Sequence, residues 1–179
     1  MGSVGFGLGG PEVGIGRPQF AEVFARARAL GLASLPHAGE TTGPETIWDA
    51  INSLAAQRIG HGIAAIQDPA LVNYLVEHGI PLEICPTSNL RTRAVAKLED
   101  HPFPALREAG VTLTLNSDDP GMFDTTLCHE YELAHTVFGL SSAQLADLSR
   151  TAVRVSFRSE TGKRELLAEI DAYERAKLP

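Results

Sequence analysis

The feature that most constrains the fold of this chain is a regular alternation of strand-like and helix-like segments. Strands are predicted at residues 3–8, 33–37, 58–60, 81–85 and 111–115. In the last of them Val111, Leu113 and Leu115 alternate with threonines, which is the pattern of a strand with one buried face. Helices are predicted from Pro18, Thr42, Asp68 and Pro102, and then over residues 125–138, 141–152 and 163–176. The order is therefore strand then helix five times, followed by further helices.

Two helix starts carry a specific signal. Thr42 with Glu45, and Ser141 with Gln144, have the spacing of a capping box, in which the two side chains satisfy free backbone N–H groups at the start of a helix. Alternating strands and helices predict a parallel sheet with right-handed crossovers. No linker or repeat interrupts the pattern, so we expect one α/β domain over residues 1–179.

The composition excludes several classes of function. The formal net charge is −7 and the sequence pI is about 5.3, which argues against nucleic-acid and anionic-membrane partners. No stretch approaches the roughly 18 apolar residues that span a bilayer, and no signal peptide opens the chain. The two cysteines, Cys85 and Cys128, lie far apart and are typical of a reducing compartment. We expect a cytoplasmic protein.

One glycine and a set of polar residues stand where the predicted strands end. They are Gly10, His37 with Glu40, His61, Ser88 with Asn89, and Asp118 with Asp119. In parallel α/β sheets, active sites form at the carboxyl ends of the strands, so these residues fall where that architecture places its chemistry. The four other histidines are predicted to be structural: His78, His101, His129 and His135.

The residue types at these ends suit a zinc site. Histidine nitrogen and aspartate oxygen are common zinc ligands, so His37 and Asp118 are candidates. Glu40 and Asp119 would be carboxylates beside the metal, suited to proton transfer or substrate binding, and His61 could orient or deprotonate a water. Each residue alone has a simpler explanation: the aspartates could cap the next helix, and a strand-end histidine is usually packed or capping.

Four segments together resemble the adenosine deaminase family. They are His37-Ala-Gly-Glu40, Arg58-Ile-Gly-His-Gly62, Cys85-Pro-Thr-Ser-Asn89 and Asn116-Ser-Asp-Asp-Pro120, in the family's order. Gly7-Leu-Gly-Gly-Pro-Glu12 is similar to the substrate loop of the same family. The resemblance covers essentially the whole chain. It implies a (β/α)8 TIM barrel of the metal-dependent hydrolase type and the hydrolytic removal of ammonia from a 6-aminopurine.

The resemblance also implies roles for individual residues. His37 and Asp118 would be zinc ligands, and Glu40 would protonate the purine N1. His61 would stabilise and help activate the attacking water. Asp119 would hydrogen-bond the purine and steer the water, and Gly10 would contact the substrate. The implied cofactor is Zn²⁺, and the implied partner is a purine nucleoside or purine base.

Three departures from the family pattern shape the expectation for this chain. It contains no His-x-His pair, which in the family supplies two further zinc ligands. A barrel of this kind takes about 250 residues, so we expect only about the last five βα units plus the C-terminal helices. Two unpaired sheet edges would then favour self-association. Gly7 stands where many adenosine deaminases carry aspartate, which leaves the purine open.

Two other interpretations stay open at this point. One is a catalytically inactive remnant that keeps the fold without the metal. The other is an unrelated small-ligand-binding α/β domain with a doubly wound sheet. Family identity favours a zinc-dependent purine aminohydrolase, whereas the missing ligands favour the remnant for this polypeptide.

Overall fold

The computed structural model describes residues 2–177 and contains a five-stranded parallel sheet. The strands are β1 (Gly5–Leu8), β2 (Ala33–Ala38), β3 (Ile59–His61), β4 (Leu82–Ile84) and β5 (Leu113–Leu115). Each strand pairs with the next one along the chain, so the sheet order is β1-β2-β3-β4-β5. This order is that of successive units of a (β/α)8 barrel. It excludes the doubly wound alternative, in which the strand order reverses within the sheet.

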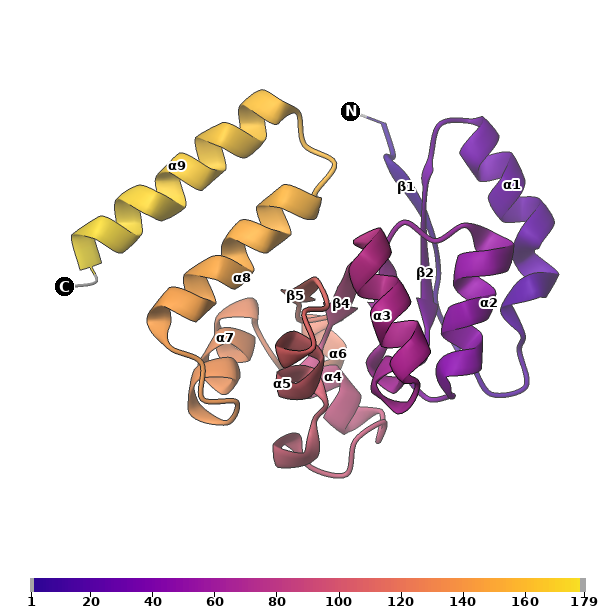
Figure 1. Cartoon of the computed structure of the whole chain (residues 1–179), viewed down its shortest axis with the longest axis horizontal. Coiled ribbons are helices and arrows are strands. Elements are labelled where there is room, and N and C mark those ends of the chain that lie inside the picture. The colour runs from indigo at the N-terminus through magenta and orange to yellow at the C-terminus, as the bar shows by residue number, and fades with distance from the viewer. Residues whose placement is uncertain (1, 178–179) are drawn as a thin grey trace.

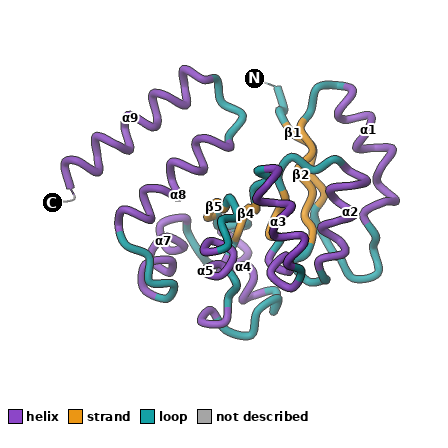
Figure 2. Tube along the Cα trace, viewed as in Figure 1, coloured by secondary structure: helices purple, strands orange, loops and turns teal. Residues whose placement is uncertain are grey.

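Helices connect the strands and cover one face of the sheet (Figures 1 and 2). The connecting α-helices are α1 (Ala21–Ala29), α2 (Pro44–Leu54), α3 (Pro69–His78), α4 (Pro86–Arg91) and α5 (Phe103–Glu108). Short 3-10 helices occupy Arg17–Phe20, Ile63–Gln67 and Leu98–Asp100. After β5 come α6 (Pro120–Phe123), α7 (Leu127–Thr136), α8 (Ser142–Val155) and α9 (Glu160–Lys177). Helix α8 packs beside β5, and α9 lies along α8.

The hydrophobic core lies between the sheet and its covering helices. Side chains of alternate strand positions, such as Ile59, Leu82 and Ile84, are fully buried there. Phe103 and Leu106 of α5 pack against the same cluster. The other alternate positions, Gly60 of β3 and Glu83 of β4, line a cavity on the other side of the sheet. One face of the sheet therefore packs against the helices in the hydrophobic core, and the opposite face is available for polar groups.

The strand and helix alternation predicted from the sequence is confirmed, and of the two predicted capping boxes one is present. Ser141 and Gln144 form the predicted capping box. The box predicted at Thr42 and Glu45 is wrong, because α2 begins after Gly43 without a side-chain cap. Thr42 instead donates its hydroxyl to Glu12, 30 residues earlier.

Helix α4 was not predicted at all. The sequence suggested only a polar strand end at Pro86-Thr-Ser-Asn89, whereas the structure has a one-and-a-half-turn helix with Pro86 at its start. Within residues 2–177, none of the helices is long and apolar enough to cross a membrane.

Candidate active site

Four of the predicted site residues meet at the carboxyl edge of the sheet. Glu40 follows β2, and its Oε2 lies 3.5 Å from Nε2 of His61, the last residue of β3. The same His61 nitrogen lies 3.8 Å from Oδ2 of Asp118, which follows β5. The ring of His37, in β2, packs edge-on against the His61 ring with 4.8 Å between centroids. Three strands thus bring two imidazoles and two carboxylates into one cluster.

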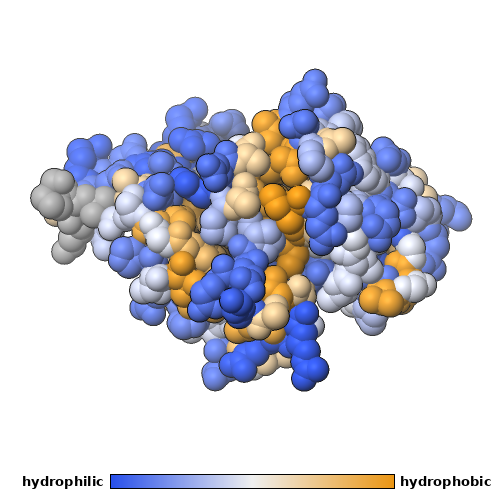
Figure 3. All heavy atoms as spheres, turned by 60° about the horizontal axis from the view of Figure 1, so that its bottom comes forward, coloured by the Kyte–Doolittle hydropathy of each residue, from blue (hydrophilic) through white to orange (hydrophobic). Residues whose placement is uncertain are grey.

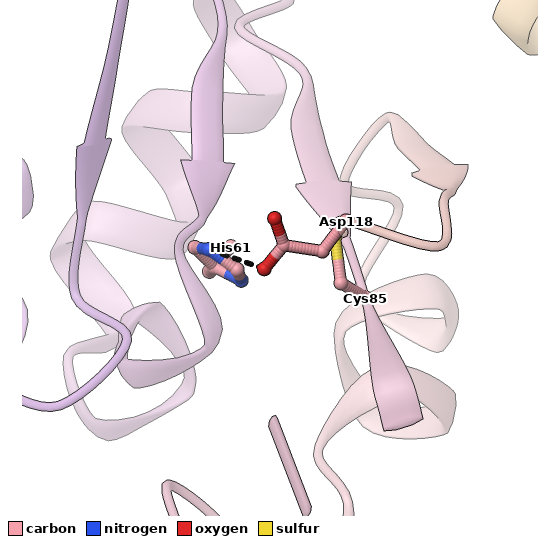
Figure 4. Close-up of side chains that lie close together, drawn as sticks. All are labelled: His61, Cys85 and Asp118. Carbon is pink, nitrogen blue, oxygen red and sulfur yellow. Dashed lines mark ion pairs between the residues drawn. The ribbon is translucent and has the colours of Figure 1, made fainter. Parts of the chain in front are cut away.

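The backbone is strained at two members of this cluster. His61 has φ of 61° and Asp118 has φ of 57°, in the left-handed region that residues with a Cβ rarely adopt. Such conformations persist where the surrounding structure imposes them, and they are enriched at functional sites. At both positions the turn comes directly at or after the strand end, and it directs the two side chains toward each other (Figure 4).

Helix α4 forms one wall of the cluster. The Ser88 hydroxyl donates to Asp118 Oδ2 at 2.7 Å. Asn89 is fully buried, and its amide nitrogen lies 3.2 Å from both Glu40 Oε1 and His61 Nδ1. The Thr92 hydroxyl donates to the same Glu40 oxygen at 2.8 Å. Glu40 Oε1 is therefore held by two donors, while Oε2 faces His61.

A buried ion pair anchors the loop that carries Glu40. Glu12, 3% exposed, accepts hydrogen bonds through Oε2 from the backbone N–H groups of Glu40, Thr41 and Thr42 at 2.9, 2.8 and 3.2 Å. Its Oε1 lies 3.0 Å from the Arg17 guanidinium, which is 2% exposed. Burial alone would raise the pKa of Glu12, but the hydrogen bonds from Thr41 and Thr42 and the charge of Arg17 outweigh it, so the pKa lies below its usual value.

A second buried carboxylate holds the start of α4. Glu130 of α7 has no exposed surface and accepts hydrogen bonds from the Thr87 backbone N–H at 3.1 Å and from the Thr125 hydroxyl. It thereby joins the helix that carries Ser88 and Asn89 to the segment after α6. Because a buried charge needs such partners to be tolerated, Glu130 ties both segments to α7.

The His37 ring sits in a confined space. A Cβ atom built on Gly60 of the neighbouring strand would lie 2.5 Å from His37 Cδ2, so the absence of a side chain there makes room for the ring. Burial lowers the pKa of His37, and the nearby His61 lowers it further, while Asp118 and Glu40 act in the opposite direction. The net pKa lies below the ordinary value of 6.5, which favours the neutral imidazole that binds metals.

The two other predicted site residues, Gly10 and Asp119, also follow strands of the sheet but take no part in the hydrogen bonds of the cluster. Asp119 is the N-cap of α6, and its Oδ1 accepts a hydrogen bond from the Met122 N–H at 2.9 Å. Gly10 is exposed with φ of 93°, and a Cβ there would meet no atom within 4 Å. Its neighbour Gly9 faces His37, with a built Cβ at 3.8 Å from the ring. Among residues 2–177, the Asp119 side chain makes no hydrogen bond or ion pair with the four clustered residues, and Gly10 has no side chain to do so.

Two cavities border the cluster. One of about 610 Å³ is lined by Glu40 and Thr92, together with apolar residues such as Ile63 and Val95. The other, of about 460 Å³, is lined by His37, His61 and Asp118, among others. Figure 3 brings the lower face of Figure 1 forward and shows an apolar strip between hydrophilic rims. Glu40 therefore borders one cavity, and His61 and Asp118 border the other, so a ligand in either cavity could reach the cluster.

The side chains at this site are of the types that bind zinc. His61, Cys85 and Asp118 offer ligand atoms that all lie within 4.8 Å of one another (Figure 4), and His37 lines the same cavity. Burial raises the pKa of the Cys85 thiol, and the charges of Asp118 and Glu83 raise it further. The thiol therefore stays protonated and points to the Glu83 carbonyl, so imidazole and carboxylate are the better ligands here.

Sequence reasoning missed the residues that support the cluster. Asn89 was recognised only as a polar strand end, and His101 was predicted to be merely structural. In the structure His101 is 4% exposed, with Nε2 3.2 Å from Asn89 Oδ1 and Nδ1 accepting from the Phe103 N–H at 3.0 Å. Glu12 and Glu130 were missed as well. The backbone N–H groups that they hold lie 28 to 43 residues away in the chain, and no local pattern reveals such contacts.

Comparisons with known proteins agree with this geometry. The chain is 55% identical over 177 residues to an aminodeoxyfutalosine deaminase from Streptomyces avermitilis, covering 99% of this chain and 49% of that protein. It is 45% identical to an adenosine deaminase from Shewanella denitrificans, covering 92% of this chain and 50% of the relative. The chain therefore spans about half the length of these relatives.

A solved structure gives the same picture. The crystal structure of an adenine deaminase from Arthrobacter aurescens matches with a TM-score of 0.93 and 37% identity, covering 96% of this chain and 53% of the other. The five βα units thus correspond to about half of a deaminase barrel. A family model described as adenosine deaminase matches residues 1–173. The chain belongs to the adenosine deaminase family.

Proposed function

We propose that the protein containing this chain is a zinc-dependent aminohydrolase that replaces the 6-amino group of a purine nucleoside or purine base with oxygen and releases ammonia. The observation that carries the proposal is the row formed by Glu40, His61 and Asp118. It places an acid and a candidate metal ligand each within 4 Å of the same imidazole nitrogen. Family membership supports the same reaction class.

Glu40 is proposed to protonate the purine at N1. Hydrolytic attack at C6 interrupts the aromaticity of the ring, so a proton delivered to N1 lowers the barrier by accepting the electron density that the attack displaces. Thr92 and Asn89 fix Glu40 Oε1, and the carboxyl also borders the 610 Å³ cavity. A carboxyl held in this way offers its proton in one direction.

His61 and Asp119 are proposed to handle the water and the purine. His61 Nε2 lies between Glu40 and Asp118, from where its N–H can orient and stabilise an attacking water. Asp119 precedes the short α6 and has one oxygen engaged in the cap, so its second oxygen is proposed to accept from the purine and to steer the water. Gly10 is proposed to approach the substrate with its backbone.

His37 and Asp118 are proposed to hold the zinc ion. When bound, the ion supplies a water of lowered pKa at neutral pH. A catalytic zinc takes at least three protein ligands, and this chain offers two of the proposed set and no His-x-His pair. A His-x-His segment from outside these 179 residues would complete the set, and the chain alone is then proposed to bind zinc weakly and to be inactive.

The substrate class is proposed from the same residues. Glu40, Asp119 and Gly10 suit the edge of a purine ring, and the three relatives are named for adenosine, adenine and aminodeoxyfutalosine. Gly7 leaves no carboxylate at the position where many adenosine deaminases carry one. Adenosine, adenine, aminodeoxyfutalosine and AMP assayed side by side would rank these substrates, and a preference for AMP would overturn the choice of nucleoside or base.

Glu40→Gln in the complete enzyme tests the reaction. Turnover should fall about a hundredfold or more, because an amide cannot deliver the proton, while zinc content stays equal to that of the wild type. Glu77→Gln, at an exposed acid of the covering helix α3, is the matched control and should keep full turnover. Near-normal turnover of Glu40→Gln would remove Glu40 from the mechanism, and a zinc-loaded wild-type enzyme without activity on any of the purines would contradict the proposed function.

A further inference from the structure

A continuous chain of hydrogen bonds runs from a backbone amide through two buried side chains to the Glu40 and His61 pair. It starts at the Phe103 N–H, passes through His101 and Asn89, and reaches both Glu40 and His61. This chain of hydrogen bonds is called the relay below. We propose that His101 and Asn89 are positioning residues, which hold His61 in the tautomer that carries its proton on Nε2 and fix Glu40 beside it. This inference rests on the proposed function for its catalytic meaning.

The first step of the relay has no ambiguity, because a backbone N–H can only donate. Nδ1 of His101 accepts from the Phe103 N–H at 3.0 Å, so that nitrogen carries no proton. A neutral imidazole then has its proton on Nε2. Burial lowers the pKa of His101 to about 4, and the ring is therefore neutral at physiological pH. The tautomer of His101 is thus fixed by the fold around α5.

The second step orients the Asn89 amide. The Nε2–H of His101 faces Asn89 Oδ1 at 3.2 Å, which is the only end of the amide that accepts. The Nδ2 end is then turned toward the site, where its two hydrogens meet Glu40 Oε1 and His61 Nδ1, each at 3.2 Å. The oxygen and nitrogen ends of an asparagine amide are ordinarily hard to tell apart. Here the Phe103 N–H fixes the tautomer of His101, and His101 in turn fixes which end of Asn89 faces it.

The third step fixes His61. Its Nδ1 receives a hydrogen from Asn89, so in the neutral ring the proton is on Nε2, the nitrogen that faces Glu40 and Asp118. Each of the four hydrogen bonds of the relay pairs a donor with an acceptor, and Asn89 and His101 are buried, so water does not compete for these bonds. Supporting groups that orient a catalytic or ligating histidine in this way commonly contribute 10-fold to 100-fold.

Imidazole nitrogen shifts in the wild-type chain test the relay without metal or substrate. Long-range proton–nitrogen correlation spectra of protein labelled with ¹⁵N-histidine distinguish protonated from unprotonated nitrogens, and His→Gln variants assign the six histidines. His101 and His61 should both show a bare Nδ1 and a protonated Nε2. His135 is the internal control with the opposite tautomer, since its Nδ1 lies 2.7 Å from the Leu140 carbonyl, which can only accept. A protonated Nδ1 on His61 in the wild type would overturn the inference.

Variants separate positioning from simple structural support. Asn89→Asp keeps the shape but removes both donors, so His61 should gain a proton on Nδ1 while the His101 and His135 signals stay unchanged. His101→Gln keeps a donor near the Nε2 position and should preserve the His61 pattern, whereas His101→Leu should lose it. An unchanged His61 in Asn89→Asp would contradict the relay.

Kinetics of the complete enzyme give the second readout. Asn89→Asp and His101→Leu should lower kcat by about 10-fold to 100-fold with KM little changed, because they misplace reacting groups without removing substrate contacts. His101→Gln should recover most of that loss. The outcomes are separable: an inactive wild type with the expected tautomers refutes the proposed function alone, and an active wild type with the opposite His61 tautomer refutes the relay alone.

Discussion

Lowering the pH from 7 to 4 should weaken folding of this chain through His101. The buried ring has a pKa of about 4, whereas an exposed histidine in the unfolded chain titrates near 6.5. Between these values the unfolded state takes up a proton at this residue and the folded state does not, so the free energy of unfolding falls as the pH falls. The contribution is complete above pH 6.5 and lost at about pH 4.

The magnitude follows from the two pKa values. At 1.36 kcal/mol per pH unit, the interval from 6.5 to about 4 corresponds to about 3 kcal/mol. Because His101 is 4% exposed and its partners are Asn89 and the Phe103 N–H, solvent screening reduces this little. Domains of this size are stable by about 5–15 kcal/mol, so the loss is a large fraction of the total.

The measurement compares wild type with His101→Gln by urea unfolding at several pH values. Fluorescence of Trp48, the single tryptophan, and far-UV circular dichroism give two independent probes. The variant should be less stable at pH 7, and the gap should narrow by about 3 kcal/mol as the pH falls to 4. Other groups that titrate in this interval, His37 included, cancel in the difference. Two parallel stability curves would refute a buried neutral His101.

Three other perturbations have defined outcomes. Glu12→Gln should lower the free energy of unfolding in urea by about 3 kcal/mol, because Arg17 stays buried without its partner. Adding Arg17→Met to Glu12→Gln should recover part of this loss, and no recovery would show that the two side chains do not interact. Gly60→Ala should weaken zinc binding about tenfold by displacing the His37 ring, and Gly2→Ala is the control. Equal zinc affinity of Gly60→Ala and wild type would show that the new methyl group does not displace His37. The free edges of β1 and β5 should cause self-association in light scattering, and a stable monomer at high concentration would contradict this.

The alternation of strands and helices was predictable because its signals are local. The last strand illustrates this: Leu113 and Leu115 alternate with threonines and are buried in the core, as predicted. The prediction of a single buried face is wrong there, because Thr114 is buried as well. The position of the polar residues at strand ends followed from the parallel topology, so the meeting of Glu40, His61 and Asp118 could be expected before any coordinates were known.

The supporting residues could not be predicted, because their partners are distant in sequence. The Thr42 hydroxyl serves Glu12 and so is not free to cap α2, although the spacing to Glu45 is right. Helix α4 has no apolar period of its own and is held by Glu130 from α7, 43 residues away. For Asp119 the simple explanation, a helix cap, is what the structure shows, and its role toward a purine stays a prediction.

The left-handed backbone at His61 and Asp118 sets how these positions can evolve. A residue with a Cβ in this conformation costs about 1–2 kcal/mol, and glycine avoids the cost. A library of variants selected for heat resistance alone should therefore accumulate glycine at positions 61 and 118, whereas one selected for turnover should keep the histidine and the aspartate. At positions 61 and 118, selection for stability and selection for catalysis therefore favour different residues.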